Sequence, residues 1–242
     1  MSIIKSDLEV CAFGIQSCLT AEKVGAVRVE LCDNPIEGGT TPSYAAIKRV
    51  RERISIQLYP IIRPRSMNYL YDNDEWNIVV NDILICKELH CDGVSVGVQT
   101  IKGEIDADKM KYLVEIAYPM HITCNRAFDA VPNPYKALEI LIDAGCKRVL
   151  TSGLAATAPE GMEMLKNLVI QAKGRISIMP GAGVRSSNVA TLKAVTGARD
   201  FHTSARKFAD NLVLFSNPAV SDAGSMYVAD EEELIKVMAA IR

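Results

Sequence analysis

Two short apolar stretches near the N-terminus repeat the pattern Glu-x-Cys. Glu9 and Cys11 lie in the first stretch. Glu30 and Cys32 lie in the second. Carboxyl groups can act as general acids or bases, and thiolates are the ligands that soft metal ions prefer. Because side chains alternate along a β-strand, the pattern predicts two strands that present carboxyl and thiol groups on one face.

Residues that bind anions follow apolar stretches further along the chain. Arg63 and Arg65 come directly after one stretch, and Arg126 comes after another. Arginine binds carboxylate and phosphate groups through two parallel hydrogen bonds, so three arginines near one opening favour an anionic ligand. A strand, a glycine turn and a helix N-terminus can also hold an anion. The residues expected to bind it are Arg63, Arg65, Arg126, Ser152, Gly181, Gly183 and Ser204.

The candidate acids and bases are Glu9, Glu30, Asp129 and His202. Buried carboxylates are costly unless they are paired with cations or hydrogen-bonded. We expect the three arginines to supply that charge, so an internal salt-bridge network is the alternative to a catalytic role for Glu9 and Glu30. For His202 the alternative is a buried, hydrogen-bonded histidine without a catalytic role.

Strand-like and helix-like segments alternate along the chain. Apolar, β-branched runs predict strands at Leu8–Ala12, Arg28–Cys32, Ile54–Ile62, Gly93–Val98, His121–Asn125, Arg148–Thr151, Ile176–Met179 and Asp200–Thr203. Helical spacing and capping residues predict helices at Ser17–Lys23, Pro42–Arg53, Asp74–Leu89, Asp106–Ala117, Pro134–Ala144, Ala158–Lys173, Asn188–Val195 and Glu231–Ile241.

Eight strand–helix units in 242 residues predict an α/β fold, a (β/α)8 TIM barrel that forms a single domain over residues 1–242. The alternative is a doubly wound open sheet, which does not explain so regular a count. Residues 207–229 are expected to form an irregular loop region or to hold a small extra element, before a C-terminal helix at 231–241. In such a barrel, chemistry takes place at the C-terminal ends of the strands, where the candidate residues lie.

Composition limits the function classes. The net charge is −2 with acids and bases interspersed, which argues against a nucleic-acid surface and a basic membrane patch. No apolar run approaches the length of a membrane span, and the first residues do not resemble a signal peptide. Seven dispersed cysteines do not suggest a disulfide framework. We therefore expect a cytoplasmic protein.

Several motifs, taken together and in order, resemble the CutC copper-homeostasis family. They are Leu-Glu-Val-Cys at 8–11, Glu-Leu-Cys at 30–32, Glu-Gly-Gly-Thr-Thr-Pro-Ser at 37–43, Ile-Arg-Pro-Arg at 62–65, Arg-Ala-Phe-Asp at 126–129, Arg-Val-Leu-Thr-Ser-Gly at 148–153, Met-Pro-Gly-Ala-Gly-Val at 179–184 and Phe-His-Thr-Ser-Ala at 201–205. The resemblance implies a cytoplasmic TIM barrel that forms a homodimer or a larger homo-oligomer. It also implies a role in copper tolerance and trafficking, with Cu(I) as the bound metal.

Two positions depart from the family pattern. The family usually has His before Arg-Ala-Phe-Asp, where this chain has Asn125. The segment after the fourth predicted strand usually reads Phe-Gly-x-Leu-Thr, where this chain has Val-Gly-Val-Gln-Thr at 96–100. The first change removes a candidate general base or metal ligand, because imidazole can serve as either.

Three functional hypotheses follow. If the first two strands are neighbours, Cys11 and Cys32 can share one Cu(I) ion. A second hypothesis is an enzyme that acts on a small anionic or phosphorylated metabolite at the arginine-lined opening. A third is a non-catalytic module that acts through its homo-oligomer.

Overall fold

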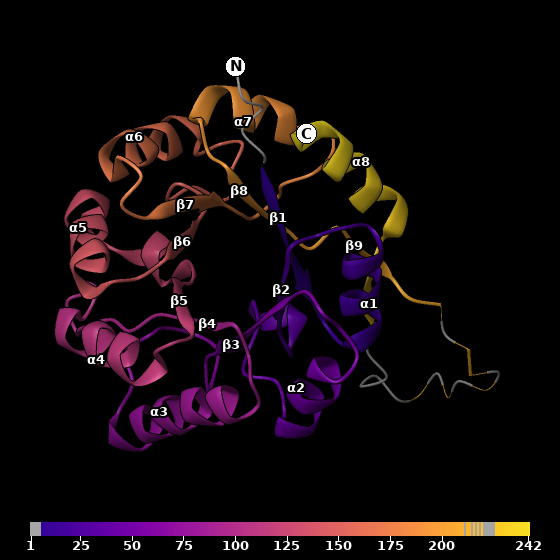
Figure 1. Cartoon of the computed structure of the whole chain (residues 1–242), viewed down its shortest axis with the longest axis horizontal. Coiled ribbons are helices and arrows are strands. Elements are labelled where there is room, and N and C mark those ends of the chain that lie inside the picture. The colour runs from indigo at the N-terminus through magenta and orange to yellow at the C-terminus, as the bar shows by residue number, and fades with distance from the viewer. Residues whose placement is uncertain (1–5, 211, 214, 216, 218, 220–225) are drawn as a thin grey trace.

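Eight parallel strands form a nearly closed barrel, with helices around its outside (Figure 1). The computed structural model describes residues 6–210, 212, 213, 215, 217, 219 and 226–242, and the fold is stated for these. The predicted (β/α)8 TIM barrel is confirmed. Its strands are β1 (Asp7–Ala12), β2 (Arg28–Leu31), β3 (Gln57–Ile62), β4 (Gly93–Val96), β5 (His121–Cys124), β6 (Arg148–Thr151), β7 (Ser177–Pro180) and β8 (Asp200–Thr203).

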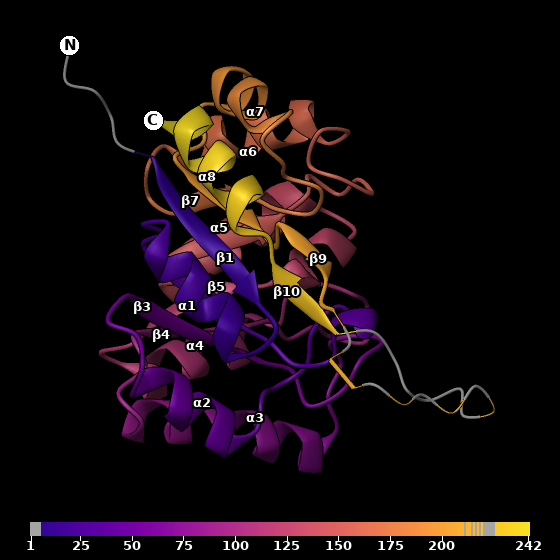
Figure 2. The same ribbon diagram turned by 90° about the vertical axis from the view of Figure 1, so that its right-hand side faces the viewer.

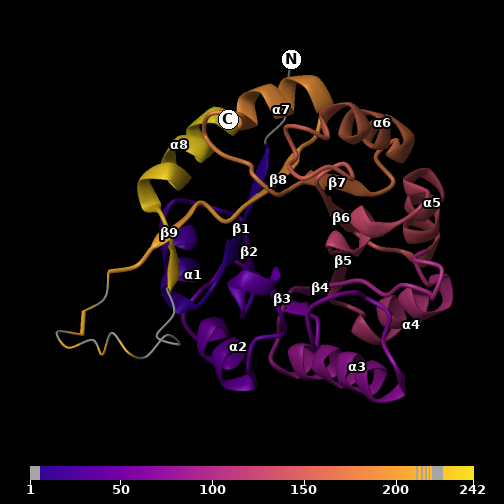
Figure 3. The same cartoon turned by 180° about the vertical axis from the view of Figure 1, so that it is seen from behind.

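The helices alternate with these strands and form the outer ring, seen from behind in Figure 3. They are α1 (Ile15–Lys23), α2 (Tyr44–Arg51), α3 (Asn73–Glu88), α4 (Ala107–Ala117), α5 (Pro134–Ala144), α6 (Met162–Ala172), α7 (Val189–Thr196) and α8 (Glu231–Ile241), with 3-10 turns η1 (Pro35–Glu37) and η2 (Arg126–Ala130). The first turn of α2 starts later than the sequence predicted. The Ser43 side chain accepts a hydrogen bond from the Ala46 N–H at 3.2 Å, and this cap fixes the start at Tyr44.

Side-chain alternation divides each strand between two environments. Leu8, Val10 and Leu31 face the helices and are fully buried in the core. On β1, Glu9 pairs with Arg28 of β2, and Cys11 pairs with Glu30. These four side chains share the interior face of the barrel, as the strand alternation predicts.

Between β7 and β8 the ring is completed by side chains. The backbone ladder of the described residues runs in the order β7-β6-β5-β4-β3-β2-β1-β8. At the N-terminal ends, the Ser177 hydroxyl donates to the Asp200 carboxylate. Further along, the Thr203 hydroxyl donates to the Val184 carbonyl oxygen at 2.7 Å. The first bond connects the two strands that the ladder leaves unpaired, and the second connects β8 to the loop after β7.

A small antiparallel pair lies beside the C-terminal end of β1, as Figure 2 shows. The strands β9 (Arg206–Phe208) and β10 (Tyr227–Ala229) form it, and the Ala229 N–H donates to the Ser17 hydroxyl of α1 at 3.1 Å. Residues 207–229 were expected to form an irregular loop or to hold a small extra element. The two ends of this segment form that element. Residues 211, 214, 216, 218 and 220–225 of that segment lie outside the described residues.

Among the described residues, none of the helices combines the length and the apolar character that crossing a membrane requires.

Candidate functional site

Two thiol groups meet inside the C-terminal half of the barrel. The Sγ atoms of Cys11 and Cys32 are 3.7 Å apart, and both cysteines are free. They come together because β1 and β2 are paired neighbours, so side chains of matching alternation face each other. Cys32 is buried and Cys11 is half-buried. The structure therefore brings the two predicted metal ligands into one pair.

A carboxyl group and an imidazole extend this thiol pair. Cys32 Sγ lies 3.5 Å from Glu30 Oε2. His202 Nε2 lies 3.7 Å from the same Glu30 oxygen. The other oxygen, Glu30 Oε1, is buried with no hydrogen-bond partner within the described residues. We call Cys11, Cys32, Glu30 and His202 the four-donor cluster.

The cations expected to neutralise Glu9 were predicted wrongly. Its carboxylate forms a fully buried ion pair with Arg28 of the neighbouring strand, not with Arg63, Arg65 or Arg126. His202 Nδ1 lies 2.7 Å from the other Glu9 oxygen. The sequence carried a signal for this partner, because Arg28 precedes Glu30 by two positions and must share its face of the strand.

Protonation within the cluster follows from these contacts. Burial raises the pKa of Glu30 to about 8, which keeps its carboxyl group protonated at neutral pH. The hydrogen bond from Cys32 lowers the pKa of Cys11 to about 5 and raises that of Cys32 well above its usual range. Burial opposes the charge of His202, but its interactions with Cys11 and Glu9 outweigh burial and raise its pKa. The result is a thiolate beside an imidazolium.

The pKa of Glu9 moves in the opposite direction from that of Glu30. Burial alone would raise it, but the ion pair with Arg28 and the hydrogen bond from His202 lower it to about 2. Glu9 is therefore an ionised group that orients the imidazole. Both of its oxygens accept hydrogen bonds, one from Arg28 and one from His202.

Two of the predicted anion ligands hold loops of their own chain. The Arg63 guanidinium donates to the carbonyl oxygens of Glu37 and Gly39 at 2.8 and 2.9 Å, and its Nε has no partner within the described residues. Arg65 forms a two-bond ion pair with Glu75 at the start of α3. Both side chains thus stabilise the connections around β3.

Arg126, Asp129 and Ser152 form a second group at the C-terminal rim. Arg126 Nε donates to Asp129 Oδ2 at 2.8 Å, and Arg126 Nη2 donates to the Ser152 hydroxyl at 3.1 Å. Asp129 also accepts from the Thr151 hydroxyl and from the N–H groups of Ser152 and Leu154. Both Asp129 oxygens are therefore engaged in holding the loop after β6. The Arg126 side chain is 44% exposed, which leaves its outer face accessible.

The glycine turn after β7 is tied to the end of β6 and to its own loop. The Gly181 N–H donates to the Thr151 carbonyl, and the Gly183 carbonyl accepts from the Asn188 side chain. Gly183 has a left-handed φ of 74°, whereas at Gly181 the requirement is space, because a Cβ there would lie 2.4 Å from Leu150 Cδ1. Ser204, the remaining anion candidate, is half-buried just after β8.

The two departures from the family pattern have structural roles here. Asn125 Oδ1 accepts from the Ala127 N–H at 3.0 Å and caps η2, while its Nδ2 is buried without a partner within the described residues. Gln99 Nε2 lies 3.2 Å from the carbonyl oxygens of both Ala127 and Ala130. Both amides therefore fix η2, the turn that carries Arg126 and Asp129.

A lower layer of the barrel was missed by the sequence analysis. Arg148 donates to the Tyr59 hydroxyl at 3.2 Å and lies over the Tyr59 ring at 4.9 Å. Asp200 accepts from Arg28 at 3.3 Å. Arg148 is the first residue of β6, and Asp200 is the first residue of β8. Because side chains alternate along a strand, counting back from the later residues of each strand would have predicted that both side chains face the barrel interior.

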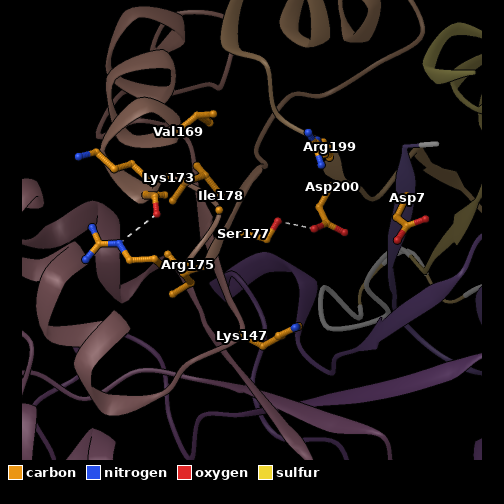
Figure 4. Close-up of a pocket in the computed structure, with 12 residues that line it drawn as sticks. Asp7, Lys147, Val169, Lys173, Arg175, Ser177, Ile178, Arg199 and Asp200 are labelled. Carbon is orange, nitrogen blue, oxygen red and sulfur yellow. Dashed lines mark hydrogen bonds between the residues drawn. The ribbon is translucent and has the colours of Figure 1, made fainter. Parts of the chain in front are cut away.

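A cavity of about 570 Å³ opens at the other end of the barrel, at the N-terminal ends of β7 and β8 (Figure 4). Lys147, Lys173 and Arg199 line it together with Asp200, which is bonded to Ser177. In (β/α)8 barrels this end contributes to stability, and chemistry takes place at the end that holds the four-donor cluster.

Comparisons with known proteins agree with the fold and the motifs. A model of the CutC family matches residues 6–207. A relative from Chromobacterium violaceum, named family protein CutC, is 49% identical over 199 residues, which cover 82% of this chain and 81% of the relative. A relative of the same name from Parabacteroides distasonis is 45% identical over 234 residues, 96% of each chain.

A solved structure gives the same result. The crystal structure of a candidate copper homeostasis protein CutC from Streptococcus agalactiae aligns with a TM-score of 0.79 and 32% identity. The alignment covers 82% of this chain and 98% of that one. The chain therefore belongs to the CutC family.

Proposed function

We propose that this protein binds Cu(I) through Cys11 and Cys32 and serves copper homeostasis in the cytoplasm. The observation that carries the proposal is the pair of free thiols whose sulfur atoms are 3.7 Å apart. Cu(I) is a soft ion that selects thiolate ligands, and the low pKa of Cys11, about 5, keeps one thiolate available at neutral pH. The name of the Streptococcus agalactiae structure supports the same role.

An anaerobic Cu(I) titration against a competing chelator tests the proposal. We expect the wild type to bind about one equivalent and the Cys11→Ser, Cys32→Ser double variant to lose that binding, because a hydroxyl is a poor ligand for a soft ion. Cys146→Ser is the matched control, since Cys146 is a buried free thiol outside the cluster. Equal binding by the double variant and the wild type would rule out this thiol pair as the copper site.

A second candidate function is catalysis on a small anionic or phosphorylated metabolite at the same end of the barrel. Two buried donors favour it, since Asn125 Nδ2 and Arg63 Nε have no partners within the described residues. Unpaired buried donors are costly, and an anion would satisfy them. Inorganic phosphate and a sugar phosphate should then raise the melting temperature of the wild type and have less effect on Asn125→Leu. A melting temperature that neither anion changes would count against this candidate.

We also propose that the protein forms a homodimer or a larger homo-oligomer. Phe208 and Met226, near the β9–β10 pair, are 63% and 64% exposed, and apolar side chains that gather at a surface often mark an interface. Sedimentation velocity at several concentrations tests this. A monomer throughout the micromolar range would contradict the proposal.

A further inference from the structure

We propose that the thiol pair is half of a tetrahedral site, in which Glu30 and His202 supply the other two ligands and the bound ion is a divalent cation of the Zn²⁺ class. This inference deepens the proposed function, because it uses the same two thiols. It differs in metal class, in coordination number and in the residues that it requires.

The distance between the thiols favours a bent arrangement. With metal–sulfur bonds of about 2.3 Å, two thiolates on opposite sides of an ion would be ~4.6 Å apart, whereas a tetrahedral angle brings them to ~3.8 Å. The sulfur atoms of Cys11 and Cys32 are 3.7 Å apart. Their spacing thus matches one edge of a tetrahedron and leaves two further ligand positions.

Glu30 lies where the third ligand is needed, and His202 lies beside Glu30. With metal–oxygen and metal–nitrogen bonds of ~2.1 Å, a tetrahedron has sulfur–oxygen edges of ~3.6 Å and a nitrogen–oxygen edge of ~3.4 Å. The Cys32 sulfur is 3.5 Å from Glu30 Oε2, and His202 Nε2 is 3.7 Å from that oxygen. The imidazole also interacts with the Cys11 thiol. The donor atoms of Cys11, Cys32 and Glu30 all lie within 4.8 Å of one another, and those of Glu9, Glu30 and His202 form a second group of the same kind. Glu30 thus links the thiol pair to the imidazole, and we infer that Nε2 moves toward the two sulfur atoms when the ion binds.

Glu9 and Arg28 hold the imidazole of His202 in an orientation that suits metal binding. A metal-binding histidine usually donates its second ring N–H to a carboxylate, which fixes the ring orientation and raises the basicity of the coordinating nitrogen. His202 Nδ1 is 2.7 Å from Glu9 Oε1, and Glu9 is held by the buried Arg28. The coordinating nitrogen is then Nε2, which faces Glu30 and gives up its proton when the ion binds.

The unpaired oxygen of Glu30 also finds an explanation. Glu30 Oε1 is buried without a partner within the described residues, and so is the hydroxyl of Ser95. The Ser95 side chain is near enough to the Glu30 carboxyl group for hydrogen bonding to favour its ionised form. When Oε2 coordinates the ion and the carboxyl group ionises, Oε1 becomes the acceptor that the Ser95 hydroxyl lacks.

Donor chemistry points to the metal class. Two thiolates, one imidazole and one carboxylate are each ordinary ligands of Zn²⁺, which adopts tetrahedral sites. Cu(I) requires the soft sulfur donors, while carboxylate is a hard ligand that adds little for it. Zn²⁺ and Cu(I) therefore compete for one pair of thiols, and only the divalent ion depends on Glu30 and His202.

Co²⁺ substitution into the metal-stripped full-length protein tests the geometry. We expect one equivalent of Co²⁺ to give intense visible d–d bands and a thiolate-to-cobalt charge-transfer band, the signature of a tetrahedral site with sulfur ligands. Zn²⁺ should abolish these bands by displacement. A weak spectrum typical of six-coordinate cobalt, or no binding, would overturn the inference in the wild type itself, whatever the variants do.

Variants then separate this inference from copper binding. Glu30→Gln and His202→Gln should each lower the affinity for Zn²⁺ by roughly 100-fold or more, since loss of a residue that only contacts a metal ligand already costs up to about 100-fold. Both variants should keep a Cu(I) affinity within about 10-fold of the wild type. Glu115→Gln and His90→Gln, at exposed positions, are matched controls. Unchanged Zn²⁺ affinity in both cluster variants would refute the four-donor site. If the protein binds Cu(I) but gives no tetrahedral Co²⁺ spectrum, the copper proposal holds and the tetrahedral site is wrong. If it gives the tetrahedral Co²⁺ spectrum but does not bind Cu(I), the tetrahedral site holds and the copper proposal is wrong.

Discussion

At the scale of single residues, the interior of the barrel matches opposite charges across neighbouring strands. Arg28 contacts Glu9 of β1 and Asp200 of β8; the pair with Glu9 is fully buried, whereas Asp200 is partly exposed. The ion pair holds Glu9 ionised, and Glu9 in turn holds the imidazole of His202. The Glu9 carboxylate is costly to bury, so its ion-pair partner contributes more to stability than the partner of a surface carboxylate would.

Replacing Arg28 should therefore be far more damaging than replacing a surface arginine. We expect Arg28→Met to lower the free energy of unfolding by about 3–5 kcal/mol, because it leaves the Glu9 carboxylate buried without its ion-pair partner. Arg49→Met is the control, since Arg49 and Glu52 form an exposed pair worth less than about 1 kcal/mol. Urea denaturation of both variants measures the difference. A similar loss in both would mean that the buried pair contributes no more than the exposed one.

At the scale of elements, one carboxylate joins two parts of the rim. Asp129 lies in η2, and its oxygens accept hydrogen bonds from the hydroxyl of Thr151 and from the N–H groups of Ser152 and Leu154. η2 is itself capped by Asn125 and held by Gln99. The rim around the four-donor cluster is thus positioned by loops that hold one another.

Loss of the Asp129 charge should loosen the loop after β6. In Asp129→Asn, one carboxylate oxygen becomes an NH₂ donor that faces N–H and O–H donors, so we expect a loss of about 1–3 kcal/mol in unfolding free energy. Hydrogen exchange should become faster at residues 152–154. The control is Asp108→Asn at an exposed position in the first turn of α4, which should cost less than about 1 kcal/mol and leave exchange at residues 152–154 unchanged. Unaltered exchange in 152–154 would show that Asp129 does not hold this loop.

At the scale of the whole molecule, the barrel closes differently at one seam. All neighbouring strands from β7 round to β8 share a backbone ladder within the described residues, but β7 and β8 are connected by side chains. The Thr203 hydroxyl, which is buried, satisfies the Val184 carbonyl beyond the end of β7. This seam lies beside His202, so its closure helps to place the imidazole.

Removing that hydroxyl should weaken the seam without a change in side-chain volume. We expect Thr203→Val to cost about 1–3 kcal/mol, because the buried Val184 carbonyl loses its donor. Amide exchange should accelerate in β7 and β8 and stay unchanged in β3 and β4. Thr20→Val removes a hydroxyl-to-carbonyl bond of similar length in an exposed position and should cost much less. Uniform acceleration across all strands would contradict a seam that opens locally.

Much of the architecture was predictable from local patterns in the sequence. Apolar runs, helical spacing and turn residues predicted the alternation of strands and helices, because each depends on residues close together in the chain. Alternation along β1 and β2 placed Glu9, Cys11, Glu30 and Cys32 inside the barrel. Boundaries were less predictable: the start of α2 depends on the cap that Ser43 forms, and the β9–β10 pair depends on partners far apart in sequence.

The sequence by itself determined which side chains enter the barrel, and the tertiary structure decided which of them meet. Glu9 pairs with Arg28 and His202 because strand register and barrel closure bring β1, β2 and β8 side by side. The same register places the four donors of the cluster together, although His202 lies 193 positions from Glu9. Distances across a closed sheet depend on stagger and curvature over the whole ring, which no local pattern specifies.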